Sequence, residues 1–308
     1  MKVVTSGYAS LDRIFQLSNA PKVGETSLIL NDNNWISSFG GCSPNIAYNL
    51  AKLGVDAYPV MRVGHDFECT GYKQYLANGG VHLDYVSEIK NDVTPFCFLF
   101  EDDCCEHTTI FYTGAQHSKY YQPIKDEYFD HASFGVITVG DPDENMEFLQ
   151  ACKQHNVPII FGMRGDQNSF PPELLTEALN SSAVIFMNRM EQGFIEKYLK
   201  LSSINDLYET GRAQIIVVTQ GRYGCQFSTK QQREFVHVPA IRTEVVDTTG
   251  SGDAFMSGFI YGLLHKKETF MCAQMGALLS SFTIQAQGCT TNSPNLEQFS
   301  EALKEAFY

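Results

Sequence analysis

Two spacings of hydrophobic residues alternate along the chain. Short apolar runs of about five residues are typical of strands covered on both faces, and apolar residues every three to four positions are typical of helices. In 43–53, for example, Ile46, Leu50 and Leu53 share one helical face, and Gly54 ends the pattern. The predicted strands are 2–6, 57–63, 135–139, 157–161, 183–187 and 214–219, and the predicted helices are 43–53, 67–77, 143–154, 172–179 and a segment from 190.

Other segments depart from this alternation. The pattern predicts two antiparallel pairs, 94–100 with 108–112 and 223–229 with 234–239, and a further short strand near 25–30. After Gly250 the chain is mostly helical, and the predicted helices are 251–265, 268–285 and 295–305.

The repeated strand–helix order predicts an α/β fold, a mostly parallel, doubly wound sheet flanked by helices. We expect a single domain over 1–308. The strands near 25–30 and 95–112 do not fit the large sheet. We therefore expect a small β-sheet lid, with segments about 13–38 and 93–118, over the carboxyl ends of its strands, where ligands bind in such folds.

Composition and charge narrow the classes of partner. The chain holds 22 Lys and Arg against 35 Asp and Glu, a formal net charge of −13. This balance argues against nucleic acid and anionic membranes as partners. No apolar run approaches the roughly 18 residues of a membrane span, and the first residues lack a signal-peptide pattern. The nine cysteines are scattered, which favours reduced thiols and a cytoplasmic location.

The sharpest chemical signal is the segment 247–258, which reads Asp-Thr-Thr-Gly-Ser-Gly-Asp-Ala-Phe-Met-Ser-Gly. Gly250, Ser251 and Gly252 directly precede an apolar helical pattern. Backbone N–H groups at a helix start bind anions such as phosphate, and glycines let the phosphate approach closely. A carboxylate at Asp253 would repel that phosphate, unless it accepts the proton of an attacking hydroxyl.

The segment also has a structural alternative, and two other nucleotide-binding motifs do not match it. A tight turn with Asp253 as a helix cap is the structural alternative. The dinucleotide-binding fingerprint does not fit, because Phe255 stands at its third glycine position. A Walker A loop does not fit either, because no Gly-Lys-Ser/Thr follows.

The whole segment resembles the C-terminal signature of the PfkB, or ribokinase-like, family of carbohydrate and nucleoside kinases, D-T-x-G-A-G-D-x-F-x-x-G. Ser251 replaces the commonest Ala. The resemblance implies a ribokinase-like fold and an ATP-dependent phosphotransferase. Asp253 would be the base, and the 250–253 backbone would stabilise the transferring phosphoryl group. The motifs of the family follow one another over essentially all 308 residues.

Two early motifs match the acceptor-binding part of the family. The segment 7–12 follows the first strand and ends at Asp12, whose carboxylate can accept hydrogen bonds from a vicinal diol. The segment 40–54 resembles the other family signature, with Gly40, Gly41 and Asn45 as substrate-binding positions. The structural alternatives are a surface turn at Asp12 and a glycine turn followed by a capped helix.

Further matches concern the nucleotide and its cations. Asn188 and Glu191 resemble the family's N-x-x-E motif, in which the Glu organises Mg²⁺ through water; a capped helix start is the alternative. Thr219, Gly221 and Gly224 resemble the nucleotide loop, or a hairpin turn, and Asn292 stands where the family lines the adenine pocket. Two more positions match residues that help hold a monovalent cation such as K⁺ in ribokinase-like members, namely Asp247 and Thr249.

The acceptor is less sharply indicated. Within the family the chain most resembles bacterial and archaeal adenosine or nucleoside kinases, and Cys42 stands where ribokinases usually carry Lys. Aromatic lid residues offer a stacking face for a base or simply pack the lid, namely Phe96, Phe98, Phe100, Phe111 and Tyr112. We expect phosphorylation of a primary hydroxyl of a nucleoside, adenosine-like first.

Several alternatives stay open at this point. A sugar kinase of the ribokinase or fructokinase type is the first, a non-catalytic ligand sensor on a kinase fold is the second, and a nicotinamide-dependent dehydrogenase is the least favoured. The protein is either a monomer or a homodimer through the lid. Arg164 would contact a phosphate or pair with an acid, and His65 is expected to face solvent.

Overall fold

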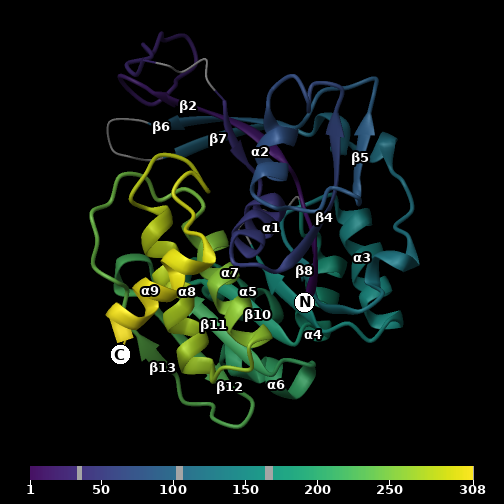
Figure 1. Cartoon of the computed structure of the whole chain (residues 1–308). Coiled ribbons are helices and arrows are strands. Elements are labelled where there is room, and N and C mark those ends of the chain that lie inside the picture. Colours follow the sequence, from purple (N-terminus) through teal and green to yellow (C-terminus); the bar gives the residue numbers. More distant parts are fainter. Residues whose placement is uncertain (33–36, 102–106, 164–168, 308) are drawn as a thin grey trace.

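The computed structural model describes residues 1–32, 37–101, 107–163 and 169–307, and within them nine strands form a central sheet (Figure 1). Its order is β13-β12-β11-β10-β9-β8-β1-β4-β5. The strands from β11 to β5 pair in parallel, and β12 and β13 join the edge in antiparallel pairing. The bounds are β1 Lys2–Ser6, β4 Asp56–Gly64, β5 Val86–Ile89, β8 Ala132–Ile137, β9 Ile159–Gly162, β10 Val184–Asn188, β11 Ile215–Thr219, β12 Cys225–Thr229 and β13 Val236–Val238.

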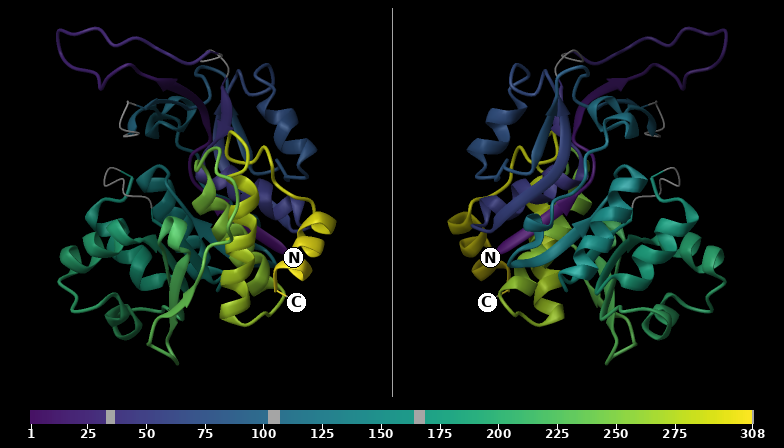
Figure 2. Two further views of the ribbon diagram at one scale, coloured as in Figure 1. Left: turned by 90° about the vertical axis from the view of Figure 1, so that its left-hand side faces the viewer. Right: turned by 90° about the vertical axis from the view of Figure 1, so that its right-hand side faces the viewer.

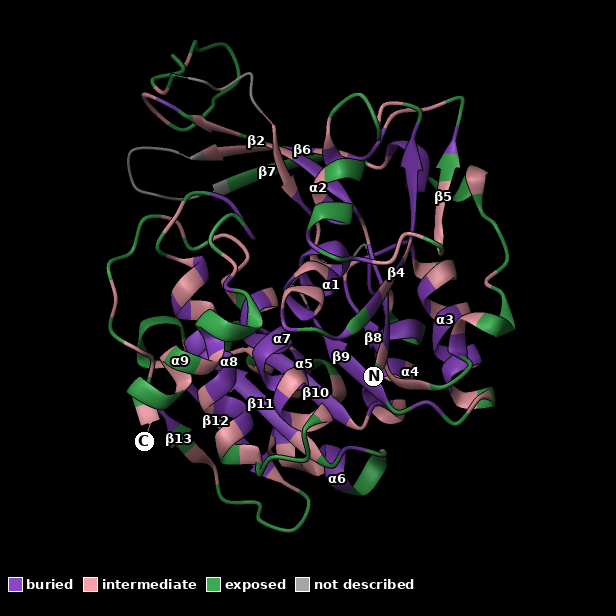
Figure 3. Cartoon of the chain, viewed as in Figure 1, coloured by how far each residue is buried: buried purple, intermediate pink, exposed green. Residues whose placement is uncertain are grey.

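Both faces of this sheet are buried (Figure 3). In β11, Val217 packs into one hydrophobic cluster, and Ile216 and Val218 pack into a second on the opposite face. Helices cover each face (Figure 2). One layer contains α1 Cys42–Lys52, α7 Ser251–Leu264 and α8 Thr269–Thr283, with α9 Leu296–Phe307 beside α8; the other contains α3 Pro142–Gln154, α4 Pro172–Ser181, α5 Arg189–Leu199 and α6 Leu207–Thr210.

A second, four-stranded sheet forms the lid, in the order β3-β2-β6-β7. Its strands are β2 Ser10–Gln16, β3 Ser38–Gly40, β6 Phe96–Glu101 and β7 His107–Tyr112. The lid lies at one end of the large sheet, and the chain around 18–31 extends away from the rest of the molecule (Figure 2). The pair β6–β7 is antiparallel as predicted, whereas β2 pairs with β6 in parallel.

The structure differs from the sequence-based elements in a few places. The predicted strand at 25–30 is wrong: the segment makes one isolated bridge, Leu17–Ile29, and its apolar side chains are exposed. The predicted helix 67–77 begins later, as α2 Tyr72–Asn78, because Gly71 with φ of 82° turns the chain immediately before it. Three short strands were not predicted, namely β2, β3 and β5.

Two further sequence expectations concern bilayers and thiols. No helix in the described part of the chain has both the length and the apolar character that crossing a membrane requires. The cysteines of the described segments are free thiols, and most are buried. Cys104, Cys105 and Arg164 lie outside the described residues.

Candidate active site

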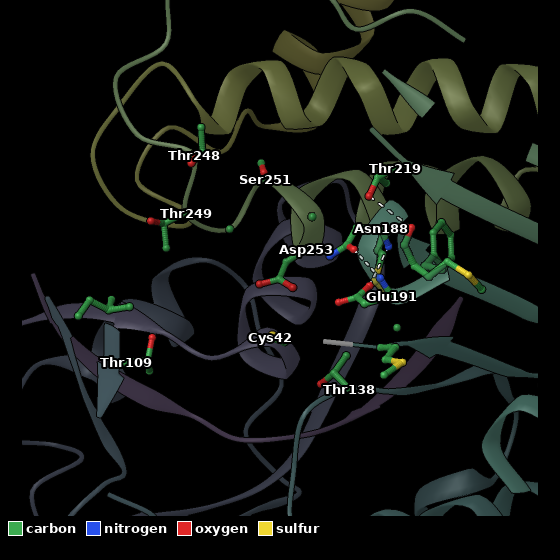
Figure 4. Close-up of a pocket in the computed structure, with 18 residues that line it drawn as sticks. Cys42, Thr109, Thr138, Asn188, Glu191, Thr219, Thr248, Thr249, Ser251 and Asp253 are labelled. Atoms are coloured by element: carbon green, nitrogen blue, oxygen red, sulfur yellow. Dashed lines mark hydrogen bonds between the residues drawn. The ribbon is translucent and has the colours of Figure 1, made fainter. Parts of the chain in front are cut away.

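A cavity of about 370 Å³ lies at the carboxyl ends of four adjacent parallel strands (Figure 4). Thr138 follows β8, Met163 follows β9, Asn188 ends β10 and Thr219 ends β11. In open parallel sheets, ligands bind beyond these ends, near the point where the strand order reverses. Here the order reverses between β1 and β8, since the chain continues from β1 to β4 on one side and from β8 to β9 on the other.

The beginning of α7 forms one wall of the cavity. Gly250 is the residue before the helix, with φ of 77°, and a Cβ there would lie 2.7 Å from the Cβ of Cys289. At Gly252, by contrast, a Cβ would meet no atom of the described residues within 4 Å. Packing within the protein therefore explains the glycine at 250, and the open space at Gly252 faces the cavity.

The charge of this wall comes from the backbone. The first N–H groups of a helix have no partner within the helix, and the helix dipole adds partial positive charge there. Among the described residues that line the cavity there is neither Lys nor Arg. The start of α7 is therefore the feature of this cavity that is suited to a phosphate group.

Asp253 lies in the first turn of α7 and points into the cavity (Figure 4). Its Oδ2 accepts a hydrogen bond of 2.9 Å from Nδ2 of Asn45, a residue of α1. The residue before the helix is Gly250 and has no side-chain cap, so the alternative interpretation of Asp253 as the helix cap is wrong. The carboxylate instead lies where the 250–252 backbone meets α1.

Among the predicted acceptor residues, Asn45 contacts Asp253, and the other three lie around the starts of β2 and α1. Asp12, on β2, accepts a hydrogen bond from Ser10, and Gly40 lies so close that a Cβ there would overlap the Asp12 carboxylate. Gly41 has φ of 100°, and a Cβ would overlap the carbonyl oxygen of Tyr8. These glycines therefore allow β2, β3 and the start of α1 to converge. These contacts link Asp12, Gly40 and Gly41 to the start of α1, the helix that carries Asn45, and the described residues that line the cavity include none of these four.

Asn188 and Glu191 form a capping box at the start of α5. Asn188 Oδ1 accepts the Glu191 N–H at 2.9 Å, and Glu191 Oε2 accepts the Asn188 N–H at 2.7 Å. Both also line the cavity, and Glu191 is only 5% exposed. The capped-helix interpretation is therefore confirmed, and it leaves a carboxylate on the cavity wall.

This carboxylate fits Mg²⁺. Mg²⁺ prefers oxygen ligands, keeps several waters and needs one or two protein carboxylates. The described residues contain no cluster of three or more His, Cys, Asp or Glu side chains that would form an all-protein metal cage. A single buried carboxylate in the same cavity as the start of α7 agrees with the lighter coordination that Mg²⁺ takes.

The remaining nucleotide positions are only partly on the cavity wall. Thr219 lines it, whereas Gly221 and Gly224 form a turn in which Gln220 N–H donates to the Gly224 carbonyl at 2.8 Å. Asn292 is exposed and donates to the carbonyl of Phe282 at 2.8 Å. The described cavity residues do not include Gly221, Gly224 or Asn292, and their contact with a nucleotide stays a prediction.

Asp247 connects two loops behind α7. Its Oδ1 accepts the Thr249 N–H and its Oδ2 accepts the Gly288 N–H, both at 2.9 Å. Thr249 lines the cavity. Both carboxylate oxygens of Asp247 therefore stabilise the loop conformation, and the monovalent-cation role of Asp247 and Thr249 stays a prediction.

Comparison with known proteins identifies the family. A family model described as pfkB family carbohydrate kinase matches residues 2–296. The chain belongs to this family. The kinase is 28% identical over 305 residues to the nucleoside kinase of Methanocaldococcus jannaschii, which covers 99% of this chain and 97% of that relative.

Solved structures agree with the fold. A nucleoside kinase structure from Methanocaldococcus jannaschii, described as an archaeal member of the ribokinase family, superposes with a TM-score of 0.86 at 28% identity over 99% of this chain and 98% of that chain. The Arabidopsis thaliana ribokinase with ribose and ATP gives 0.82 at 24% identity over 98% of each chain. The Burkholderia thailandensis nucleoside kinase with inosine gives 0.82 at 22% identity, over 99% of this chain and 98% of that chain. The ribokinase-like fold class predicted from the sequence is confirmed.

Several cavity residues of the kinase were not predicted. Thr138 is one: its Oγ1 donates to the Ser6 carbonyl at 2.8 Å. A threonine directly after the apolar residues of β8 could have indicated this position from the sequence, because a polar side chain in buried surroundings needs a hydrogen-bond partner. Cys42 lines the cavity as well, at the position noted for its departure from ribokinases. Leu99 and Thr109 reach the cavity from the lid.

The lid register decides which aromatic residues face the cavity. Leu99 and Thr109 are paired across β6–β7 and line the cavity, so residues two positions away share their face. Phe111 belongs to this face, and its ring lies 5.0 Å from that of Tyr8. Four of the five lid aromatics lie on the opposite face, which agrees with the packing alternative for them, namely Phe96, Phe98, Phe100 and Tyr112.

Burial keeps two neighbouring groups neutral. It raises the pKa of the Cys289 thiol well above its ordinary value, and the charges of Asp12 and Asp253 add to the effect. It raises the pKa of the Tyr72 hydroxyl in the same way, and that hydroxyl donates to the Gly40 carbonyl at 2.6 Å.

His65 is exposed, with Nδ1 2.8 Å from the Asp92 carbonyl oxygen, so its solvent-facing position is confirmed.

Proposed function

We propose that this pfkB-family kinase transfers the γ-phosphoryl group of ATP to a primary hydroxyl of a nucleoside, adenosine-like first. The observation that carries the proposal is the position of Asp253, in the first turn of α7 beside the glycine-lined phosphate wall and hydrogen-bonded to Asn45 at 2.9 Å. Asn45, one of the expected acceptor residues, contacts this carboxylate directly, and Gly41 immediately precedes the helix that carries Asn45.

The residues define a simple in-line transfer. The Asp253 carboxylate orients the acceptor hydroxyl and takes its proton as the oxygen bonds to the γ-phosphorus. The bond between phosphorus and the β-γ bridging oxygen breaks, and ADP leaves. Backbone N–H groups at 250–253 stabilise the charge of the transferring group. Asn45 orients the carboxylate of Asp253 through its hydrogen bond.

Glu191, supported by Asn188, would hold Mg²⁺ through water beside the phosphates, and a bound Mg²⁺ would neutralise phosphate charge. A carboxylate on the wall with its Oε2 fixed by the Asn188 N–H at 2.7 Å is suited to that task. Thr219, Gly221, Gly224 and Asn292 would contact the nucleotide. K⁺ would lie near the loop that Asp247 and Thr249 form.

The acceptor assignment is supported by the lid. Asp12 would accept hydrogen bonds from a ribose diol, and the Phe111 and Tyr8 rings, 5.0 Å apart, would offer a surface for a base. Nucleoside kinases are also among the relatives of this chain. A sugar kinase is the alternative, because a free sugar would use Asp12 in the same way and ribokinases are relatives as well.

Assembly and location complete the proposal. The outward face of the lid carries a ring cluster in which Phe15 stacks on Phe100 at 5.4 Å and contacts Phe98 at 5.6 Å. Ile110 and Tyr112 lie on the same face and are exposed, and an exposed apolar surface of this kind favours a homodimer through the lid over a monomer. Free thiols support a cytoplasmic location.

An ADP-release assay tests the proposal. Purified protein is assayed with ATP, Mg²⁺ and adenosine, inosine, cytidine, ribose, fructose or fructose phosphate. We expect adenosine to give the highest kcat/KM, and Asp253→Asn to melt like the wild type but lose roughly 10²- to 10⁴-fold in kcat. Near-native kcat in this variant would contradict the role of Asp253. Release of no ADP with any acceptor would favour the ligand-sensor alternative.

A further inference from the structure

The chain connects the large sheet to the lid through buried links. Residues 7–9 join β1 to β2, and the short 3-10 helix η1, Gly114–Gln116, follows lid strand β7. Gln116 is 2% exposed and contacts the first link twice. Its Oε1 accepts the Ala9 N–H at 3.0 Å, and its Nε2 donates to the Gly7 carbonyl at 3.3 Å. One side chain therefore holds the two links together.

Arg62 fixes η1 to the large sheet. Arg62 lies on β4 and is 2% exposed. Its Nε donates to the Ala115 carbonyl at 3.1 Å, and a terminal nitrogen donates to the Gln116 carbonyl at 3.0 Å. The other terminal nitrogen lies 2.5 Å from the carboxylate of Glu144 on α3. A guanidinium makes such divergent contacts from one rigid plane.

The link 7–9 in turn positions the acceptor side of the active site. The Tyr8 N–H donates to the Val139 carbonyl at 2.7 Å, and Gly41 packs directly against Tyr8 and Ala9. Asp12 lies only three residues beyond Ala9, on the strand that starts at Ser10. Buried backbone groups must be paired, so the contacts of Gln116 restrict where this strand can begin.

We propose that Gln116 and Arg62 are positioning residues that fix the start of lid strand β2, and through it Asp12, relative to Asp253. The described residues that line the cavity do not include either of them. They act through the links between sheet and lid. The inference rests on the proposed function in one respect, that Asp12 holds the acceptor.

Gln116→Met tests the inference, because methionine keeps the length of the side chain but makes neither hydrogen bond. Gln16→Met is the matched control, since Gln16 is an exposed residue of the same lid strand β2. A displacement of about 1 Å in a bound reactant can cost roughly 100-fold in rate. We expect Gln116→Met to raise the acceptor KM roughly 10- to 100-fold, with the KM for ATP within about twofold of wild type.

A rise in the acceptor KM with an almost unchanged KM for ATP distinguishes a positioning role from a general loss of stability. A variant that is merely less folded would show a lower kcat with both KM values unchanged. Equal acceptor KM values for Gln116→Met, Gln16→Met and the wild type would overturn the proposal. The wild-type assay alone decides whether a nucleoside or a sugar is the acceptor, so failure of the proposed function is seen separately.

Arg62→Lys is the second variant, and it tests the inference alone if Gln116→Met does not fold. Lysine keeps a positive charge near Glu144 but loses the paired contacts to the Ala115 and Gln116 carbonyls. We expect the same selective rise in acceptor KM. In the double variant the effects should be less than additive, because both residues act on one link. Additive effects, or an equal rise in the KM for ATP, would refute the shared positioning role.

Discussion

Gly252→Ala distinguishes the effect on stability from the effect on catalysis at the start of α7. Gly252 lies in the first turn of α7, where a Cβ would meet no atom of the described residues within 4 Å. The substitution therefore causes no steric clash within the protein. Because alanine is favoured over glycine in helices, we expect the free energy of unfolding to rise by up to about 1 kcal/mol.

The same methyl group would occupy space beside the phosphate wall. Anion binding there depends on close approach of the phosphate to backbone N–H groups. A displacement of about 1 Å would lower kcat/KM for ATP roughly 100-fold. The variant should therefore be at least as stable as the wild type and much less active.

Gly193→Ala is the matched control. Gly193 lies in α5, also with no atom of the described residues within 4 Å of its Cβ position, and it is exposed. It should gain about 1 kcal/mol as well, with unchanged activity. Urea unfolding and steady-state ADP release measure the two effects. Wild-type kcat/KM for ATP in Gly252→Ala would refute the phosphate-binding role of this wall.

Three further predictions follow from other contacts. Burial raises the pKa of Glu144 to about 7, partly opposed by Arg62, against an ordinary value of 4.5. The folded state then binds the proton more tightly than the unfolded state, so stability is complete below about pH 4.5 and falls by at most about 3 kcal/mol as the pH rises through 7. In Glu144→Gln, the free energy of unfolding measured with urea should change less with pH between about 4.5 and 7 than in the wild type. The same change with pH in both proteins would contradict this prediction. Asp247→Asn keeps only one of the two acceptor oxygens, so we expect urea unfolding to show a loss of about 1–3 kcal/mol in the free energy of unfolding. For the wild type, we expect initial rates that differ between potassium and tetramethylammonium buffers. Equal rates in the two buffers would contradict a K⁺ site. Phe111→Ala should raise the KM for nucleosides about tenfold and leave that for ribose unchanged, with Phe98→Ala, on the opposite lid face, as the control.

The sequence was most informative where structure depends on local patterns. The alternation of apolar runs and helical periods predicted the parallel sheet, because burial on both faces requires nearly continuous apolar strands. The glycines around Ser251 and the acid at 253 predicted a helix mouth with a carboxylate, and that is where α7 begins. The glycines and the acid lie within a dozen residues, so the geometry of this segment is set by the backbone nearby.

Local pattern failed where a segment needs distant partners. Apolar residues near Ile29 predicted a strand, but the structure provides only a single bridge to Leu17. The short strand β2 was missed because its residues Ser10–Gln16 alternate weakly, and its conformation depends on pairing with β6, which lies far along the chain. Strand formation in such segments follows from the partner strand and not from propensity alone.

The sequence by itself determined the glycine-rich signature of the family, most of the strand–helix order and the residues available for chemistry, because these follow from composition and spacing along the chain. Only the tertiary structure decided which of them meet. Asn45 and Asp253 are 208 positions apart and yet hydrogen-bonded, and Gln116 joins two links that no periodicity connects. Strand pairing, lid register and helix packing produce these contacts, and each of them depends on the whole fold.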